Sequence, residues 1–265
     1  MALSDFLKMK LLISILLFIL GTIFGSFLNC IIYRLKEKKS FLKGRSFCPY
    51  CKHILSWKDL IPILSFIFLK GKCRYCKKKI PIQYPSIEFL TGILAFFSFF
   101  PLIENFSFFN LQSSIFNFLF FSLLILIFVF DLKYYSIPDQ ILISAILISI
   151  LYRIFNFSSF QNLFFSLLPS LLFLFLVLVS KEKWLGFGDF EISIFMGIFL
   201  GWPKILVALF FSIFAGALIG LVLILLKKKS LKSQIPFAPF LVSGTFFALF
   251  FGQSLIDFYN SFLLE

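Results

Sequence analysis

The chain has 265 residues, of which 60% are hydrophobic, 44 are Phe and only 14% are charged. Its mean hydropathy of +1.02 excludes a water-soluble globular protein, because such a protein needs enough polar side chains to cover its surface. The net charge of +13, from 25 Lys and Arg against 12 Asp and Glu, suggests basic loops on one side of a membrane rather than a nucleic-acid-binding surface.

Long apolar runs predict an all-α polytopic membrane protein with about eight transmembrane helices. The first run, residues 11–33, is long enough to cross a hydrocarbon core of about 30 Å at about 1.5 Å per residue. It lacks a small-residue cleavage site and stays apolar too long for a cleaved signal peptide. The sixth of the eight runs is short for a crossing. The seven spans predicted after the first are 86–103, 114–130, 139–155, 162–180, 190–201, 204–226 and 237–256; the sixth of the eight is thus 190–201.

The positions of the basic residues predict the topology. If the eight spans cross alternately, four polar segments lie on one side: 34–85, 131–138, 181–189 and 227–236. These segments contain 21 of the 25 Lys and Arg. The positive-inside rule then places them in the cytoplasm and places both termini outside.

Four of the five cysteines lie in the loop 34–85, as two Cys-x-x-Cys pairs with 21 residues between them. Such pairs offer four thiolates to a zinc ion, which binds its ligands tetrahedrally. Disulfides are the alternative, but they are rare in the reducing cytosol. We therefore expect structural zinc bound by Cys48, Cys51, Cys73 and Cys76, and we expect the metal to stabilise a loop with little core of its own.

Two further side chains near this region have a simpler interpretation. His53 is the only histidine, and we expect it to be solvated or hydrogen-bonded because four thiolates already fill a structural site. Cys30, inside the first span, is expected to pack as a small hydrophobic residue. The basic residues of the loop are interpreted as a topology signal rather than as a lipid-binding patch.

Five of the twelve carboxylates lie at the predicted cytoplasmic edge of the membrane: Glu88, Asp131, Asp139, Asp189 and Glu191. The others, such as Asp59, lie in polar segments or at outer ends and need no special role. At the membrane edge desolvation disfavours the ionised form, and two facing carboxylates would hold one proton between them. One carboxylate could then act as a base toward water while the other polarises a peptide carbonyl, which is aspartic-protease chemistry.

Helix-end rules distinguish these acids only in part. Asp139 and Asp189 precede predicted spans and suit helix N-termini, whereas Asp131 ends a span, where a negative charge is unfavourable. Gly186 and Gly188 would allow a backbone turn and the close approach of a substrate strand just before Asp189. The residues alone do not choose between Asp131 and Asp139 as the partner of Asp189.

Several short motifs occur in a fixed order along most of the chain. The first is Gly25-Ser26-Phe27-Leu28-Asn29 with Arg34, and the later ones are Cys48-Pro49-Tyr50-Cys51-Lys52-His53, Asp59-Leu60-Ile61-Pro62, Gly71-Lys72-Cys73, Tyr84-Pro85-Ser86-Ile87-Glu88, Asp131-Leu132-Lys133 with Ile137-Pro138-Asp139, and Gly186-Phe187-Gly188-Asp189. Together they resemble type IV prepilin peptidases, membrane aspartic proteases of the Gly-x-Gly-Asp class that usually also methylate the new N-terminus. The chain departs from the family pattern in Cys30, where a Val-like residue is common, and in having Phe at many positions that are usually Leu or Ala.

The resemblance implies a division of labour along the chain. It implies that Asp131 and Asp189 are the catalytic dyad, located in a helical bundle of residues 86–265. It also implies cleavage of the basic leader of prepilins or pseudopilins, the substrates of type IV pilus and type II secretion systems, at the cytoplasmic face of the bacterial inner membrane. Membrane lipids would be its surroundings, and no nucleic acid is implied.

The second activity implied by the resemblance is N-methylation with S-adenosylmethionine as the methyl donor. It is attributed to the first helix, residues 1–33, together with the cysteine loop 34–85. Four residues are candidates to bind the cofactor or the amine: Ser26, Asn29, Arg34 and Glu88. Helix packing explains Ser26 and Asn29 equally well. The sequence has no glycine-rich nucleotide-binding fingerprint that would independently indicate this cofactor.

Three other functions are consistent with parts of the sequence. A presenilin-like protease with another membrane substrate would share the Gly-x-Gly-Asp element, but the cysteine loop speaks against it. An ion- or proton-coupled transporter would use Asp131, Asp139 and Asp189 as a relay, and it predicts acids near the bilayer midplane and inverted repeats. A scaffold that displays a zinc-binding loop would need no dyad.

Overall fold

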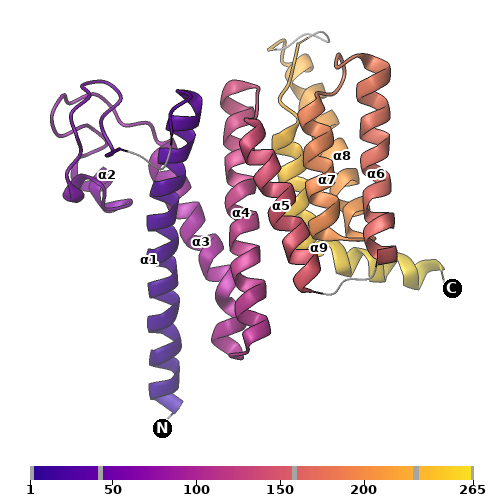
Figure 1. The fold of residues 1–265 in the computed structure, drawn as a ribbon, viewed down its shortest axis with the longest axis horizontal. Helices are drawn as coiled ribbons and strands as arrows, with labels where there is room; N and C mark the ends of the chain where they lie inside the picture. Colours follow the sequence, from indigo (N-terminus) through magenta and orange to yellow (C-terminus); the bar gives the residue numbers. More distant parts are fainter. Residues whose placement is uncertain (1–2, 41–43, 157–159, 229–232, 264–265) are drawn as a thin grey trace. The chain divides into compact units, whose positions relative to one another are not determined.

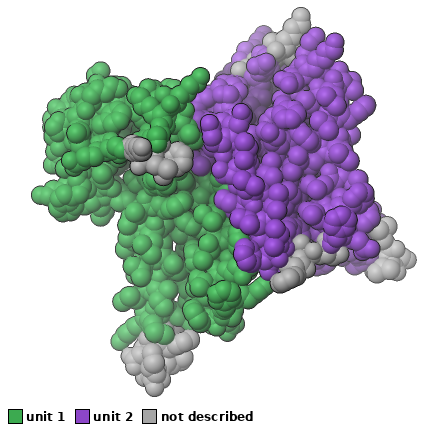
Figure 2. Space-filling model, viewed as in Figure 1, with its two compact units in different colours: residues 1–125 green, residues 126–265 purple. Residues whose placement is uncertain are grey.

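The computed structural model describes residues 3–40, 44–156, 160–228 and 233–263, and within these ranges most of the chain is helical (Figure 1). The pairings of extended backbone found there are two isolated bridges, Phe47 with Ile54 and Lys72 with Lys79. The predicted all-α fold class is therefore confirmed. The chain divides into two compact units, residues 1–125 and 126–265, and the boundary falls inside one helix (Figure 2).

Unit 1 is built on two long helices that pack closely. Its elements are α1 (Leu3–Lys36), η1 (Trp57–Asp59), α2 (Leu64–Phe68), α3 (Gln83–Glu104) and the first part of α4 (Phe108–Tyr134). Gly21 and Gly25 lie one turn apart on α1, where it meets α3. A Cβ at Gly25 would lie 2.0 Å from Thr91 Oγ1 and 2.7 Å from Glu88 Cα. The absence of a side chain at Gly25 therefore permits the close approach of the two helices.

Unit 2 surrounds a short central helix. Its elements are the end of α4, α5 (Asp139–Phe155), α6 (Phe160–Ser180), α7 (Phe187–Leu200), α8 (Lys204–Leu225) and α9 (Ala238–Leu263). The helix α7 contacts α5, α6, α8 and α9, and its Ile192 and Phe195 are fully buried. Near the C-terminal end of α7, Arg153 Nε donates a hydrogen bond to the Ile198 carbonyl. This end is thereby fixed, while the opposite end carries Asp189.

Each of the eight predicted spans falls on a helix. Six of the described helices, α1, α3, α4, α6, α8 and α9, are long and apolar enough to cross a membrane, judged by length and composition. The other two, α5 and α7, have 17 and 14 residues. At about 1.5 Å per residue, α7 measures roughly 21 Å against a hydrocarbon core of about 30 Å. The polytopic character is confirmed, and the count of eight crossings stays a prediction.

Candidate active site and metal centre

Asp131 lies in the last turn of α4 and is half-buried. Its Oδ2 accepts a hydrogen bond of 2.9 Å from the backbone N–H of Ala238, the first residue of α9. A negative charge at the C-terminus of α4 is unfavourable with respect to the dipole of α4, as expected, but a second helix also meets this carboxylate. The carboxylate caps the N-terminus of α9, where a negative charge is favourable. Asp131 is thus held by a residue 107 positions away in the sequence.

Asp189 lies in the first turn of α7 and caps its own helix, as expected. Its Oδ2 accepts a hydrogen bond of 3.1 Å from the N–H of Gly186, and its own N–H donates to the Gly186 carbonyl at 3.1 Å. Burial raises the pKa of Asp189 to about 7; the bond from Gly186 lowers it, and the charge of Asp131 raises it. Asp189 is therefore a carboxyl group that can hold a proton near neutral pH.

The two carboxylates lie at one end of unit 2, close enough for the charge of Asp131 to raise the pKa of Asp189. Within the described chain, each receives one hydrogen bond, through Oδ2 in both cases, so that Oδ1 of each is left for a water molecule or a substrate. Mutual repulsion favours the state in which one is ionised and the other protonated. Such a pair can supply both a base and an acid.

Asp139 belongs to a different pair. It is exposed in the first turn of α5, and its charge acts on Glu191 of α7 rather than on Asp189. Carboxylates from three helices therefore gather at the same end of unit 2, with Asp131 beside Asp189 and Asp139 beside Glu191.

The glycines before Asp189 leave space rather than forming a turn. Gly186 has φ −77° and ψ 156°, an extended conformation that any residue adopts, so the backbone at this position does not itself require a glycine. The atom nearest to a Cβ at Gly186 would be Asp189 Oδ2 at 3.8 Å, and at Gly188 it would be Leu142 Cδ1 at 4.0 Å. The backbone before Asp189 is therefore open to the close approach of another chain.

The cysteine loop forms two knuckles of the same form. In the first, Cys48 N–H donates to the His53 carbonyl and Lys52 N–H to the Cys48 carbonyl, both at 2.9 Å. The same pattern recurs after Cys73, where Lys77 N–H donates to the Cys73 carbonyl at 3.0 Å. Lys52 and Lys77 occupy equivalent positions, with φ values of 59° and 58°. The repeated turn directs the thiols of both pairs to one point.

This arrangement fits a tetrahedral metal. The sulfurs of Cys48, Cys51, Cys73 and Cys76 all lie within 4.8 Å of one another. Cys48 Sγ and Cys76 Sγ are 3.9 Å apart, and two sulfurs at about 2.3 Å from a tetrahedral zinc ion would be about 3.8 Å apart. Burial raises the pKa of Cys48, but backbone N–H groups of the knuckle together with the thiols of Cys51 and Cys73 outweigh this and bring it to about 7, so that the thiolate of Cys48 is accessible. The predicted ligand set can therefore hold a metal ion.

The remaining histidine and cysteine lie outside this cluster. The His53 ring is exposed and stacks on Tyr75, with 3.6 Å between ring centroids. Cys30 is half-buried in α1 and forms no disulfide. The exposed ring agrees with the expected solvated histidine, and the partly covered Cys30 agrees with the expected packing within the first span.

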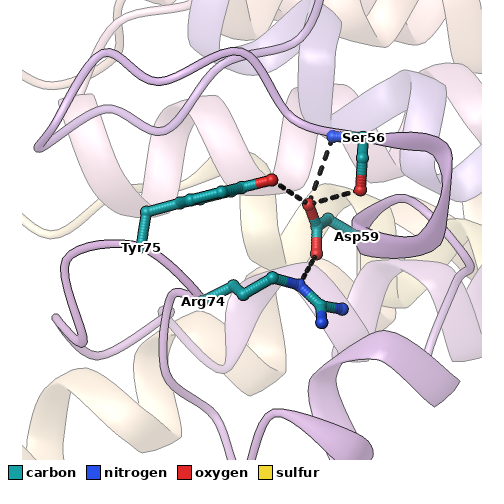
Figure 3. Close-up of polar contacts among 4 residues, drawn as sticks. All are labelled: Ser56, Asp59, Arg74 and Tyr75. Atoms are coloured by element: carbon teal, nitrogen blue, oxygen red, sulfur yellow. Dashed lines mark hydrogen bonds and ion pairs between the residues drawn. The ribbon is translucent and has the colours of Figure 1, made fainter.

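Asp59 fastens the second knuckle to the chain between the two knuckles (Figure 3). Its Oδ1 accepts from Arg74 Nε at 2.7 Å, and its Oδ2 accepts from Tyr75 OH at 3.2 Å and from the N–H and hydroxyl of Ser56 at 3.1 and 2.8 Å. Burial raises the pKa of Asp59, but Arg74 and Ser56 keep it below its usual range. The expectation that Asp59 needs no special role is corrected, because the carboxylate is only 3% exposed and holds two residues located between Cys73 and Cys76.

Three of the four residues expected to bind cofactor or amine come together where α1 meets α3. The Ser26 side chain interacts with the Glu88 carboxylate. Asn29 Nδ2 donates to the carbonyls of Gly25 and Tyr84 at 3.3 and 3.1 Å, while the buried Oδ1 of Asn29 has no hydrogen-bond partner among the described residues. A buried acceptor without a donor is rare in folded proteins, and it fits a ligand that brings an N–H group.

Arg34 has a different role from the other three. Its guanidinium donates to the carbonyls of Ser40, Gly44 and Arg45 at 3.3, 2.8 and 3.3 Å. It therefore holds the start of the cysteine loop against the end of α1. These contacts explain a buried arginine at this position without a cofactor.

Comparison with known protein families gives two matches that follow each other along the chain. The model of the bacterial peptidase A24 N-terminal domain matches residues 19–102, which include the cysteine loop. The model of the type IV leader peptidase family matches residues 118–221, which include Asp131 and Asp189.

Similar proteins cover nearly the whole chain. A prepilin leader peptidase/N-methyltransferase of Bacillus subtilis is 32% identical over 92% of this chain and 96% of its own length. Proteins with the same description from Legionella pneumophila and Aeromonas hydrophila are 30% and 29% identical, over 89% and 92% of this chain and 90% and 92% of their own. The comparison with solved structures gave no match.

Proposed function

Because the chain belongs to the prepilin leader peptidase/N-methyltransferase family, we propose that it removes leader peptides from prepilins or pseudopilins with Asp131 and Asp189 as its catalytic dyad. The observation that carries this proposal is the interaction of these two carboxylates at one end of unit 2. Asp139, the other aspartate that the sequence offers, is exposed and interacts with Glu191 instead.

The geometry supports a division of roles within the dyad. Asp189, whose pKa burial raises to about 7, holds the proton, and Asp131 is the ionised base. Asp131 takes a proton from a water molecule, whose oxygen attacks the scissile carbonyl carbon, while Asp189 gives its proton to the carbonyl oxygen. Collapse of the tetrahedral intermediate breaks the C–N bond; the proton now on Asp131 goes to the leaving nitrogen, and a hydroxyl group of the intermediate returns a proton to Asp189.

The dyad suits a membrane-inserted substrate cut at the cytoplasmic face. In the proposed topology the ends of α4 and α7 that carry the two aspartates are cytoplasmic, the large cysteine loop lies on the same side, and both termini lie outside. A leader rich in Lys and Arg would meet an acidic surface there, because Asp139 and Glu191 lie at the same end as the dyad. Open space beside Gly186 and Gly188 admits the scissile strand.

Methylation of the new N-terminus is assigned to unit 1. Ser26, Asn29 and Glu88 fit an amine or the positively charged part of S-adenosylmethionine, because they offer a carboxylate and an acceptor, Asn29 Oδ1, without a donor. The cofactor, when bound, supplies the methyl group. Glu88 holds the amine in place by charge and hydrogen bonding. Arg34 is left out of this set because loop carbonyls already occupy its guanidinium.

Zinc is proposed as the metal of the cysteine cluster. Four sulfurs in tetrahedral spacing and a small loop between two helices are typical of a structural zinc site. Zinc would hold the two knuckles together, and with them the loop that separates α1 from α3.

A cleavage assay with matched variants tests the dyad. Purified protein in detergent is mixed with a synthetic prepilin, and product is measured for wild type, Asp131→Asn, Asp189→Asn and Asp139→Asn. We expect the first two variants to lose activity by about a thousandfold or more and the third to stay within a few fold of wild type. Cleavage by Asp131→Asn at the wild-type rate, or its loss in Asp139→Asn alone, would refute the assignment.

A further inference from the structure

The cysteine loop carries large apolar side chains on its surface that neither the metal site nor the proposed activities use. Trp57 of η1 is 71% exposed, and Ile67 and Phe68 of α2 are 59% and 81% exposed. Leu64, Ile67 and Phe68 stand at positions i, i+3 and i+4 of α2 and therefore share one face of that helix. We define the apolar loop surface as Trp57, Ile61, Leu64, Ile67 and Phe68.

A hydrogen bond fixes the level at which this surface lies. The N–H of Ile63, the residue just before α2, donates to Glu88 Oε2 at 2.7 Å. Glu88 is five residues after Gln83, the first residue of the span α3, which places it about 7 to 8 Å along the helix axis. In Figure 1, α2 accordingly lies at the level of the upper turns of α1 rather than beyond the end of that helix.

The backbone conformation of Ile63 is one that only surrounding contacts, such as the bond to Glu88, can maintain. Ile63 has φ 60°, and Leu64 N–H donates to the Pro62 carbonyl at 2.5 Å, which makes a tight turn. A β-branched residue rarely adopts such a conformation, and it persists only where surrounding contacts enforce it. The buried Glu88 carboxylate supplies that contact. The start of α2 is thus held beside the membrane-spanning part of α3.

The charge around this surface is strongly positive. Between residues 57 and 82 the only acid is Asp59, which is engaged with Arg74. The same stretch contains seven basic residues: Lys58, Lys70, Lys72, Arg74, Lys77, Lys78 and Lys79. Lys58 Nζ lies 5.6 Å from the centre of the Trp57 ring, which joins an aromatic and a basic side chain as is common at membrane interfaces.

We propose that the apolar loop surface is inserted into the cytoplasmic leaflet of the membrane, among anionic phospholipids. Interfacial helices bury their apolar face about 5–10 Å into the boundary between headgroups and acyl chains, and the attachment to Glu88, which lies at the predicted cytoplasmic edge of the membrane, holds α2 at that boundary. Each basic residue near an anionic bilayer surface adds to the attraction. The basic residues of the loop are then a lipid-binding feature as well as a topology signal. The cysteine loop is attached to the membrane at three places: α1, α3 and this surface.

Quenching of Trp57 fluorescence tests the proposal independently of either enzyme activity. The variant Trp184→Phe/Trp202→Phe keeps Trp57 as its only tryptophan and is reconstituted into vesicles of phosphatidylglycerol and phosphatidylcholine. Bromine atoms on the acyl chains quench only an inserted indole, and iodide in the buffer quenches only an exposed one. We expect brominated lipids to remove most of the Trp57 emission and iodide to remove little of it.

Substitutions at Phe68 supply the matched pair. Phe68 is 81% exposed, so that replacing it leaves the core of the loop intact. We expect Phe68→Asp to release Trp57 to iodide at unchanged metal content and Phe68→Leu to behave as wild type. Strong iodide quenching of Trp57 in the unsubstituted loop, or quenching by lipid that Phe68→Asp leaves unchanged, would overturn the proposal. Equal results in vesicles of phosphatidylcholine alone would remove the role of anionic lipids.

Discussion

Replacing Asp189 by Asn is expected to abolish peptide cleavage and at the same time to stabilise the protein at neutral and alkaline pH. Burial, as the largest cause, raises the pKa of Asp189 from 3.8 to about 7. The folded protein therefore holds the ionised form only at a cost in free energy. The difference between the two pKa values corresponds to about 4 kcal/mol, at about 1.36 kcal/mol for each pH unit.

The sign of the pH dependence follows from proton binding. Because the folded protein binds this proton more tightly than the unfolded chain, the proton stabilises the fold fully below about pH 3.8, and that stabilisation is lost as the pH rises to about 7. The loss amounts to about 1.6 kcal/mol at pH 5 and to about 4 kcal/mol above pH 7. Asn carries no charge at any pH, and its amide oxygen can still accept the hydrogen bond from Gly186.

Unfolding in detergent at pH 5 and pH 8 measures this difference. We expect Asp189→Asn to exceed wild type by about 2 kcal/mol at the lower pH and by about 4 kcal/mol at the higher one. Asp139→Asn is the control, because it removes an exposed carboxylate at the same end of unit 2, and its gain at pH 8 should be smaller than that of Asp189→Asn. Equal stability of Asp189→Asn and wild type at pH 8 would show that Asp189 is not buried as described. Cleavage by wild type should likewise fall above about pH 7, where Asp189 loses the proton that the mechanism uses.

Three further substitutions test separate parts of the structure. Gly25→Ala should destabilise the protein by about 1–3 kcal/mol, measured by unfolding in detergent, because its Cβ would meet α3 at 2.0 Å; an unchanged stability would mean that α1 and α3 are further apart than described. Gly186→Ala should fold normally but lower kcat/KM for prepilin by about tenfold or more, because the methyl group occupies space left for the substrate; a wild-type value would show that the substrate passes elsewhere. Asp59→Asn should weaken zinc binding by about tenfold in competition with a chelator, whereas Glu37→Gln, at an exposed ion pair of the same loop, should leave it unchanged; equal zinc affinity in both would remove the role of Asp59 in holding the knuckle.

The apolar pattern of the sequence predicts the helices well because lipid imposes a simple requirement on each of them. A run of about twenty apolar residues has no alternative to a helix in hydrocarbon, so each predicted span lies on a helix. Length alone does not determine whether α5 and α7 cross. The helix α7 has four helical neighbours that cover it, and a helix surrounded by protein need not match the thickness of the bilayer. Whether such a helix crosses the membrane therefore depends on tertiary packing, which cannot be read from the apolar pattern of one segment.

The cluster of four cysteines was predictable and the contacts that support it were not. Two Cys-x-x-Cys pairs specify four thiols at tetrahedral spacing through local geometry, and the repeated turn at Lys52 and Lys77 is the form this geometry takes. Asp59 has one partner nearby in the sequence, Ser56, and the bond from Arg74 spans 15 residues across the loop. An acidic residue in a basic loop looks like an exposed charge until the chain folds back on it.

The partner of Asp189 could not be chosen from the sequence because the relevant helix dipole belongs to another part of the chain. Judged by the helix it ends, Asp131 stands at the wrong end, while Asp139 stands at the right one. The contact that reverses this judgement is the hydrogen bond from Ala238 at the start of α9, 107 residues later. Asp139 lies at the favourable end of its own helix and is exposed. A charge that violates the rule for its own helix is retained only where another element compensates for it, which is the situation expected of a functional group. The unfavourable position of Asp131 was therefore the more informative signal, and it points to the same residue as the family resemblance.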